Sequence, residues 1–330
     1  MPGMTAPETG GRDPGRTALA IRDAIGWPAL VEVVRTAERT GYERLFLPEI
    51  TARETFSTLA ALAGKTLGIG LGTGVVPIVA RSMPVTAMAA ATVQDVSDGR
   101  MVLGLGTGPA GPGALDRLRS FVESTRRVLA GETVRDAQDS GSFRLTLELP
   151  GGPPPIWIAA LGPRAMRLAG EVADGVILNW CPPERVAFAR ERIAEGATAA
   201  GRDPSDVTIA VYVRAVVGQE RHHAMPALRV AAAQYASYPA YRRQFEEVGL
   251  GSEADAAAAA LPPGRPDEVP DALVEAVTVA GDAEHARARL RAYREAGADV
   301  PVVYPVAVLD AESSIVGTLF ALAPSPAVEA

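Results

Sequence analysis

Residues 67–108 read LGIGLGTGVVPIVARSMPVTAMAAATVQDVSDGRMVLGLGTG. Residues 67–73 and 101–105 are short apolar runs with the length of buried strands, and residues 84–97 between them have the spacing of an apolar helix face. A glycine-rich turn, residues 104–108, follows the second run. A strand, a helix and a second strand in this order predict two parallel strands joined by a crossover helix.

The same alternation extends along the chain in both directions. Eight short apolar strands separated by helices are the number that closes into a TIM barrel, so we predict a single (β/α)8 barrel of the α/β class. An open, doubly wound sheet is the alternative. The predicted strands are residues 17–22, 44–48, 67–73, 101–105, 156–160, 175–179, 207–217 and 301–306.

Three segments fall outside this alternation. Residues 1–16 are rich in glycine and proline and predict a flexible N-terminal tail, which leaves residues 17–330 as one barrel domain. Residues 132–149 contain a Ser-Gly turn flanked by alternating apolar residues, which predicts a small hairpin inserted after the fourth helix. Residues 220–276 predict a mostly helical insertion between the seventh and eighth strands.

The composition limits the functional classes. The chain has 330 residues, a formal net charge of −7, three histidines and one cysteine, Cys181. One cysteine cannot form an intramolecular disulfide, and with so few histidines we expect no metal site. The acidic balance disfavours nucleic-acid binding, and no apolar run approaches the ~20 residues of a membrane span. Because the N-terminus lacks the pattern of a secretory signal, we expect a cytoplasmic protein with a small-molecule substrate.

Two turns at neighbouring strand ends have the composition of a phosphate site. Residues 104–108 read GLGTG, and residues 159–164 read AALGPR. Glycine at a strand end lets backbone N–H groups approach a phosphate, and a helix start beside Arg164 attracts an anion. One phosphate-bearing cofactor would explain both turns; a tight turn without a ligand is the alternative for each. The candidate residues are Gly106, Thr107, Gly108, Ala159, Ala160, Leu161, Gly162, Pro163 and Arg164.

Glu49 is the candidate acid–base residue, because it directly follows the second strand, where chemistry sits in such barrels. The alternative is an ion pair with Arg53 or Arg22.

Other strand ends supply candidates for the substrate pocket. Trp180 either walls a ring-shaped ligand or caps the barrel. Tyr212, Arg214 and the helical insertion are expected to shape the pocket. If Glu49 does not supply a proton, the expected donor is Tyr304, Tyr212 or the solvent around the substrate.

Three motifs occur together in this chain. They are TGV at residues 73–75, SDGRMVLGLGTG at residues 97–108, and IAALGP at residues 158–163 with AGEVADG at residues 169–175. In this combination the chain resembles the bacterial luciferase-like flavin and deazaflavin oxidoreductases, over about residues 17–306. The resemblance is closest to the branch that uses coenzyme F420. It implies a (β/α)8 barrel with the cofactor ring over a bulge at the third strand.

The resemblance also implies site residues. Members of the family have a non-prolyl cis peptide in the bulge, and Gly74–Val75 is the matching step. Thr73, Gly74 and Val75 are therefore expected to contact the ring, with the cofactor phosphate near the two glycine turns. Glu49 occupies the position of an acid after the second strand, and Asn179 that of a hydroxyl residue that contacts the ring region. Both are candidates for catalysis.

The chain departs from the sugar-phosphate dehydrogenases of the family. Those enzymes carry a histidine beside the acid, a glutamate after the GTG turn and a lysine after the sixth strand. The matching residues here are Ile50, Pro109 and Pro182. Glucose 6-phosphate is therefore not expected as the substrate.

These observations predict an oxidoreductase that transfers a hydride between reduced coenzyme F420 and a small organic substrate. The abundance of Ala, Gly, Pro and Arg is typical of GC-rich genomes and fits an actinobacterial source of that coenzyme. The alternatives are an FMN-dependent luciferase-like monooxygenase and a non-catalytic flavin-binding barrel. The resemblance implies a homodimer, which we place on the helix faces near Ala60 and Met88.

Overall fold

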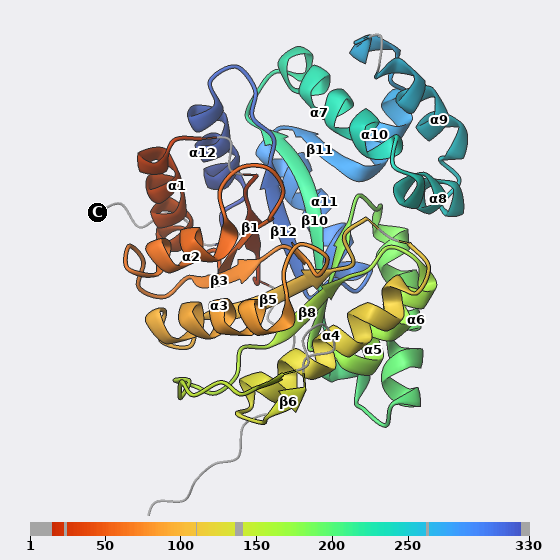
Figure 1. The fold of residues 1–330 in the computed structure, drawn as a ribbon. Helices are drawn as coiled ribbons and strands as arrows, with labels where there is room; N and C mark the ends of the chain where they lie inside the picture. Colours follow the sequence, from red (N-terminus) through yellow and green to blue (C-terminus); the bar gives the residue numbers. More distant parts are fainter. Residues whose placement is uncertain (1–14, 23–24, 110, 136–140, 262–263, 325–330) are drawn as a thin grey trace, which may run out of the picture.

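The computed structural model describes residues 15–22, 25–109, 111–135, 141–261 and 264–324 (Figure 1). Eight parallel strands form a central barrel surrounded by helices, which confirms the predicted (β/α)8 fold. The barrel strands are β1 (Ala18–Ala20), β2 (Arg44–Leu47), β3 (Gly70–Thr73), β5 (Met101–Gly106), β8 (Ile156–Ala159), β9 (Gly175–Asn179), β10 (Thr208–Val217) and β12 (Val300–Pro305).

The strand β10 closes the barrel. It pairs with β12 from Ala210 to Ala215, and it pairs with β9 from Thr208 to Tyr212. Around the ring the order is β10, β12, β1, β2, β3, β5, β8 and β9. An open doubly wound sheet would leave two free edges, so the β9–β10 pairing rules out that alternative.

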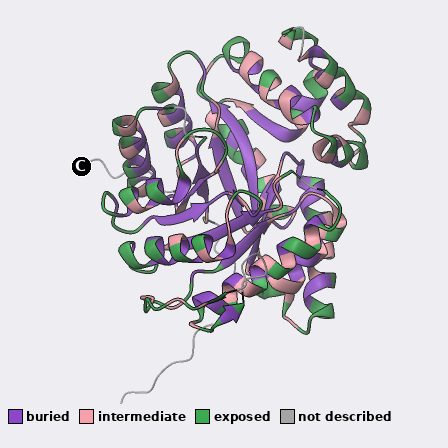
Figure 2. Ribbon diagram, viewed as in Figure 1, coloured by how far each residue is buried: buried purple, intermediate pink, exposed green. Residues whose placement is uncertain are grey.

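Helices cover the outside of the barrel with one apolar face each. In the first of them Leu30, Val33, Val34 and Ala37 are buried against the strands at helical spacing. Figure 2 shows the strands buried and the outward helix faces exposed. These helices are α1 (Trp27–Arg39), α2 (Thr55–Ala63), α3 (Met83–Val96), α4 (Ala114–Leu129), α5 (Pro163–Val172), α6 (Pro183–Ala199), α11 (Ala283–Glu295) and α12 (Ala311–Ala321).

Aromatic side chains fill the barrel interior. The Phe46 and Trp157 rings lie 5.5 Å apart between centroids, and the Tyr212 ring lies 6.2 Å from Phe46. A Cβ atom at Gly175 would come within 2.5 Å of the Trp157 indole, so this position needs glycine for packing. The interior is therefore a packed core, and a ligand must bind above it, at the mouth formed by the strand C-termini.

Both predicted insertions contain the expected type of structure. β6 (Val134–Arg135) and β7 (Ser142–Phe143) form an antiparallel pair; residues 136–140 lie outside the described residues. The segment after β10 is helical. It contains α7 (Arg221–Ala236), α8 (Pro239–Glu247), α9 (Gly251–Ala260) and α10 (Asp271–Val277).

Two short strands were not predicted. β4 (Val76–Pro77) pairs with β5 beside the barrel, and β11 (Thr278–Gly281) pairs in parallel with β10 from Arg214 to Val217. The N-terminal half of β10 pairs with β9, and its C-terminal half pairs with β11. Because the β9–β10 pairing ends at Tyr212, side chains of the helical insertion reach the barrel mouth at this point.

The N-terminal segment is described only from Gly15 onward, so residues 1–14 of the predicted tail lie outside the described residues. Arg16 forms an ion pair of 2.7 Å with Glu43. None of the helices in the described ranges has the length and apolarity that crossing a bilayer requires.

Candidate active site

The centre of the site is a bulge between β3 and β4. The peptide between Gly74 and Val75 is cis, as the resemblance implied. The Tyr212 hydroxyl donates a hydrogen bond of 3.1 Å to the Gly74 carbonyl, and the Glu49 N–H donates one of 3.3 Å to the Val75 carbonyl. A Cβ atom at Gly74 would clash with the Tyr212 hydroxyl. Contacts from β2 and β10 therefore fix the bulge at the barrel mouth.

Thr73 supports the bulge from below. It is fully buried, and its hydroxyl both donates to the Gly104 carbonyl (2.8 Å) and accepts from the Gly104 N–H (2.7 Å). Its polar side-chain contacts are thus with β5, although the resemblance implied contact with the cofactor ring. A Cβ atom at Gly106 would come within 2.8 Å of a Val75 methyl group. These glycines let β5 pack closely against the bulge.

The two glycine turns leave backbone groups available at the mouth. Gly108 has a φ of +68°, which favours glycine, and the Thr107 hydroxyl donates to the Gly108 carbonyl at 3.0 Å. Gly162 precedes α5, and no atom lies within 4 Å of a Cβ atom built there. The Met166 N–H bonds to the Gly162 carbonyl at 3.1 Å, and the preceding N–H groups at a helix start have no helical acceptor. An anion fits this open turn, with the exposed Arg164 beside it.

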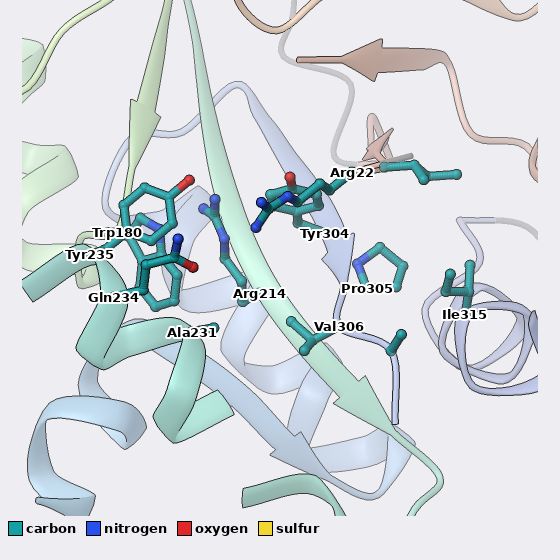
Figure 3. A pocket seen from close by; sticks show the side chains of 12 residues that line it. Arg22, Trp180, Arg214, Ala231, Gln234, Tyr235, Tyr304, Pro305, Val306 and Ile315 are labelled. Atoms are coloured by element: carbon teal, nitrogen blue, oxygen red, sulfur yellow. The ribbon is translucent and has the colours of Figure 1, made fainter. Parts of the chain in front are cut away.

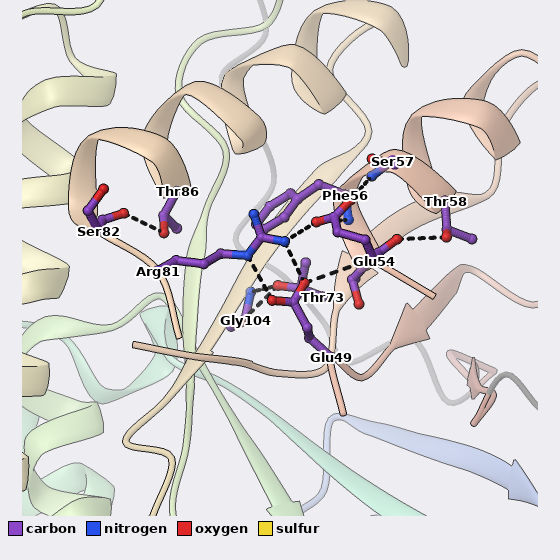
Figure 4. Close-up of polar contacts among 11 residues, drawn as sticks. Glu49, Glu54, Phe56, Ser57, Thr58, Thr73, Arg81, Ser82, Thr86 and Gly104 are labelled. Carbon is purple, nitrogen blue, oxygen red and sulfur yellow. Dashed lines mark hydrogen bonds and ion pairs between the residues drawn. The ribbon is translucent and has the colours of Figure 1, made fainter. Parts of the chain in front are cut away.

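Glu49 takes part in an ion-pair network that Figure 4 shows in detail. Its two carboxylate oxygens accept hydrogen bonds of 2.7 and 2.9 Å from the Arg81 guanidinium, which also pairs with Glu54. The Thr55 N–H is a further donor to Glu49, at 3.3 Å. The alternative prediction of an ion pair is confirmed, but the predicted partners, Arg53 and Arg22, are wrong. Arg81 was missed because it lies 32 residues away in sequence.

A cavity of about 200 Å³ lies at the mouth, at the ends of β1, β9, β10 and β12. Arg214 is buried in its wall and lies between aromatic rings, as Figure 3 shows. The guanidinium carbon is 4.2 Å from the centroid of the Tyr304 ring, 4.5 Å from that of Trp180 and 5.4 Å from that of Tyr235. The cavity is therefore aromatic and carries a positive charge.

Asn179 connects this cavity to the helical insertion. Its Oδ1 atom accepts a hydrogen bond from Arg214, and its Nδ2 atom donates one of 2.8 Å to the Tyr241 hydroxyl on α8. Both ends of the amide are thus engaged by protein groups. This geometry makes Asn179 a residue that positions Arg214.

Comparison with known proteins places this geometry in a family. The model of the luciferase-like monooxygenase family matches residues 4–300. The chain belongs to this family. A 5,10-methylenetetrahydromethanopterin reductase from Methanolobus tindarius is 29% identical over 287 residues, covering 81% of this chain and 87% of that protein. A Mycobacterium tuberculosis protein named as a coenzyme F420-dependent oxidoreductase is 28% identical over 309 residues, covering 82% and 89% of the two chains.

A solved structure has the same fold. The coenzyme F420 dependent tetrahydromethanopterin reductase from Methanopyrus kandleri superimposes with a TM-score of 0.77 at 21% identity, covering 92% of this chain and 97% of that one. Membership of the luciferase-like family confirms the resemblance that the motifs indicated.

The buried tyrosines at the barrel mouth of this luciferase-like protein stay protonated at neutral pH. Burial raises the pKa of Tyr304 to about 12, and the nearby Arg214 charge offsets part of this effect. Burial also raises the pKa values of Tyr212 and Tyr241. The Tyr212 hydroxyl donates its hydrogen bond to the Gly74 carbonyl in the bulge, whereas Tyr304 lines the cavity. Tyr304 is therefore a neutral tyrosine in the wall of the cavity.

These tyrosines predict a loss of stability in alkali. A tyrosine whose pKa is raised on folding stabilises the folded state below its unfolded pKa of about 10, and this contribution is lost as the pH rises further. We expect the free energy of unfolding to fall above pH ~10 by about 1.4 kcal/mol per pH unit for each such tyrosine. Denaturant unfolding followed by circular dichroism between pH 8 and about 12 measures this slope.

Tyr42 provides the control for this prediction. It is buried, is not among the residues that line the cavity, and donates to the Leu319 carbonyl at 3.0 Å. Burial raises its pKa. Tyr42→Phe should therefore reduce the alkaline slope by the share of one tyrosine. Stability that does not change up to pH ~12 would contradict the assignment of these pKa shifts.

Sequence reasoning missed several residues of the site. Tyr235 and Tyr241 come from the helical insertion, and Arg81 lies in the loop between β4 and α3. The stretch QYASYPAY at residues 234–241 places three tyrosines close together, which is the signal that a search for aromatic clusters would have found. Their rings contact one another, with 4.9 Å between the centroids of Tyr235 and Tyr241.

Proposed function

We propose that this protein is an oxidoreductase that transfers a hydride between reduced coenzyme F420 and a small organic substrate. The observation that carries the proposal is the bulge at Gly74–Val75, fixed by Tyr212 and Glu49 beside an aromatic cavity. The names of the Mycobacterium tuberculosis relative and the Methanopyrus kandleri structure support the choice of coenzyme. Neither name specifies a substrate for this chain.

The residues at the mouth fit such a cofactor. The backbone of the bulge offers a support for a flat ring, and Val75 is only partly buried there. The open turn before α5 and the turn at Gly106–Gly108 would hold the phosphate through backbone N–H groups. Arg164 would add a guanidinium at the same turn.

Reduced coenzyme F420, when bound, supplies a hydride to the substrate. The protein then has to hold the substrate, exclude water and provide one proton to the reduced group. We assign that proton to Tyr304, because this neutral tyrosine lines the cavity and the Arg214 charge stabilises the tyrosinate left behind. Solvent restores the proton after product release.

Glu49 has a different role in this proposal. Its carboxylate oxygens are occupied by Arg81 and its N–H by the bulge, so it holds the ring support in place. We regard it as a positioning residue.

Cofactor consumption tests this function. Purified protein with reduced coenzyme F420 should oxidise it when a panel of small carbonyl compounds is added, without oxygen uptake. Oxygen uptake with reduced FMN, and no reaction with reduced coenzyme F420, would favour a luciferase-like monooxygenase. Bound cofactor without turnover over a broad panel would favour a non-catalytic barrel.

We also propose a homodimer through α3. Val85, Met88 and Val96 are exposed on this helix, and their spacing places them on one side of it. Such an apolar stripe is typical of a protein interface. Light scattering at micromolar concentration should give twice the mass of the chain, and Met88→Glu should shift the protein toward monomer. A monomer at all concentrations would contradict the prediction.

A further inference from the structure

Arg214 is a buried cation without an acidic partner. Its exposed fraction is 3%, and its hydrogen bond with Asn179 joins it to a neutral amide. In the described parts of the chain, no carboxylate lies within ion-pairing distance of this guanidinium. Buried charges are usually paired, because leaving water is costly for an ion. The aromatic rings around Arg214 compensate only part of that cost.

An unsatisfied donor lines the same cavity. Trp180 is 1% exposed, and its indole Nε1–H has no acceptor among the described residues. Arg22 adds a further positive charge at the exposed edge of the cavity. The described lining residues include no aspartate or glutamate. Two cations and one unpartnered N–H donor around one cavity fit an anion with oxygen acceptors.

The backbone holds these donors in a fixed arrangement. Trp180 has a φ of +53°, an uncommon conformation for a bulky residue. The buried Gln244 side chain donates to the carbonyls of Trp180 (2.7 Å) and Asn179 (3.0 Å), which fixes this turn. Tyr241 fixes the Asn179 amide that binds Arg214. Such preorganisation is expected of a binding site.

We propose that this cavity binds the carboxylate of an organic acid, which is the substrate class of the enzyme. The proposal rests on the proposed function, which places the cofactor phosphate at the ends of β5 and β8. In the closed strand order β1 and β12, which line part of the cavity, lie opposite β5 and β8, and β10, which carries Arg214, is separated from β8 by β9. The anion bound at Arg214 is therefore a group of the substrate.

The remaining lining defines the body of this acid. Ile21, Val306 and Ile315 contribute apolar surface to the cavity. A small hydrocarbon chain or ring would contact these residues while its carboxylate accepts hydrogen bonds from Arg214 and Trp180.

Binding of matched acids and amides tests the proposal. The probes are butanoate, hexanoate, decanoate and benzoate, each compared with its primary amide by calorimetry on protein loaded with oxidised coenzyme F420. At least one acid should bind about 10- to 100-fold more tightly than its amide, as expected for hydrogen bonds to a charged group. In Arg214→Gln this preference should disappear, while in Arg214→Lys part of it should remain.

Two further variants separate the contributions of Trp180 and Arg22 to acid binding. Trp180→Phe should weaken binding of the acid about three- to tenfold, because it removes one neutral donor. Arg22→Gln should have a smaller effect, because this charge is exposed. Circular dichroism of each variant, measured on the same preparations, shows whether the protein is folded.

The outcomes separate the two proposals. An acid preference in a protein that does not bind coenzyme F420 would support the carboxylate site and contradict the proposed function. Coenzyme binding with no acid preference for any probe would overturn the carboxylate site alone. A loss of coenzyme affinity in Arg214→Gln as large as the loss of acid affinity would also overturn it, because Arg214 would then serve the cofactor.

Discussion

Tyr304→Phe is expected to lower kcat about 100- to 10,000-fold, the usual contribution of general acid–base catalysis. The substitution removes one hydroxyl and keeps the ring that packs 4.2 Å from the Arg214 guanidinium. Coenzyme affinity should therefore stay within about threefold of wild type, because the site keeps its shape. Stopped-flow measurement of coenzyme oxidation with a substrate identified from the panel gives kcat and KM separately.

Glu49→Gln is the comparison that decides where the proton comes from. Because Arg81 can still pair with Glu54, we expect the fold to persist and kcat to fall less than in Tyr304→Phe. A larger loss in Glu49→Gln than in Tyr304→Phe would return the proton transfer to Glu49. Tyr42 is a buried tyrosine whose hydroxyl donates to the Leu319 carbonyl. Tyr42→Phe should leave kcat unchanged, and it controls for the loss of a tyrosine hydroxyl outside the cavity.

Val75→Asp is expected to weaken binding of coenzyme F420 about 100-fold or more. In the free protein Val75 is partly exposed, so a carboxylate there stays hydrated and the fold is kept. A cofactor ring lying on the bulge would remove that water, and burying an unpaired charge costs several kcal/mol, of which about 2.7 corresponds to 100-fold. Equilibrium titration of the coenzyme, with circular dichroism as the folding control, measures the effect.

Val75→Thr is the matched control, since threonine has nearly the same shape and no charge. We expect its coenzyme affinity to remain within about threefold to tenfold of wild type, the range of one hydroxyl group. Equal affinities for wild type, Val75→Thr and Val75→Asp would show that the ring does not lie on this bulge.

The sequence was sufficient to predict the barrel, because its strands and helices have clear local patterns. Each barrel strand is a short apolar run, and the helix at residues 27–39 shows the apolar spacing that buries Leu30 and Val33. β11 could not be predicted in this way. Its residues 278–281 are too few to show an alternation of apolar and polar residues. They form a strand only because the C-terminal half of β10 offers a free edge.

The site was only partly predictable, because several of its contacts join segments that are distant in sequence. Gly74–Val75 was found through the family motif, and its cis peptide is present. The partner of Glu49 and the surroundings of Arg214 depend on contacts between distant segments, such as the 62 residues between Asn179 and Tyr241. Local sequence patterns carry no information about such contacts.

Titration of the wild-type protein with coenzyme F420 and, separately, with FMN shows which of the two cofactors the barrel mouth binds. Coenzyme fluorescence and absorbance report binding without any substrate. We predict that coenzyme F420 binds with a dissociation constant in the micromolar range or below, and at least about tenfold more tightly than FMN. Tight binding of FMN together with no spectral change for coenzyme F420 would contradict the claim.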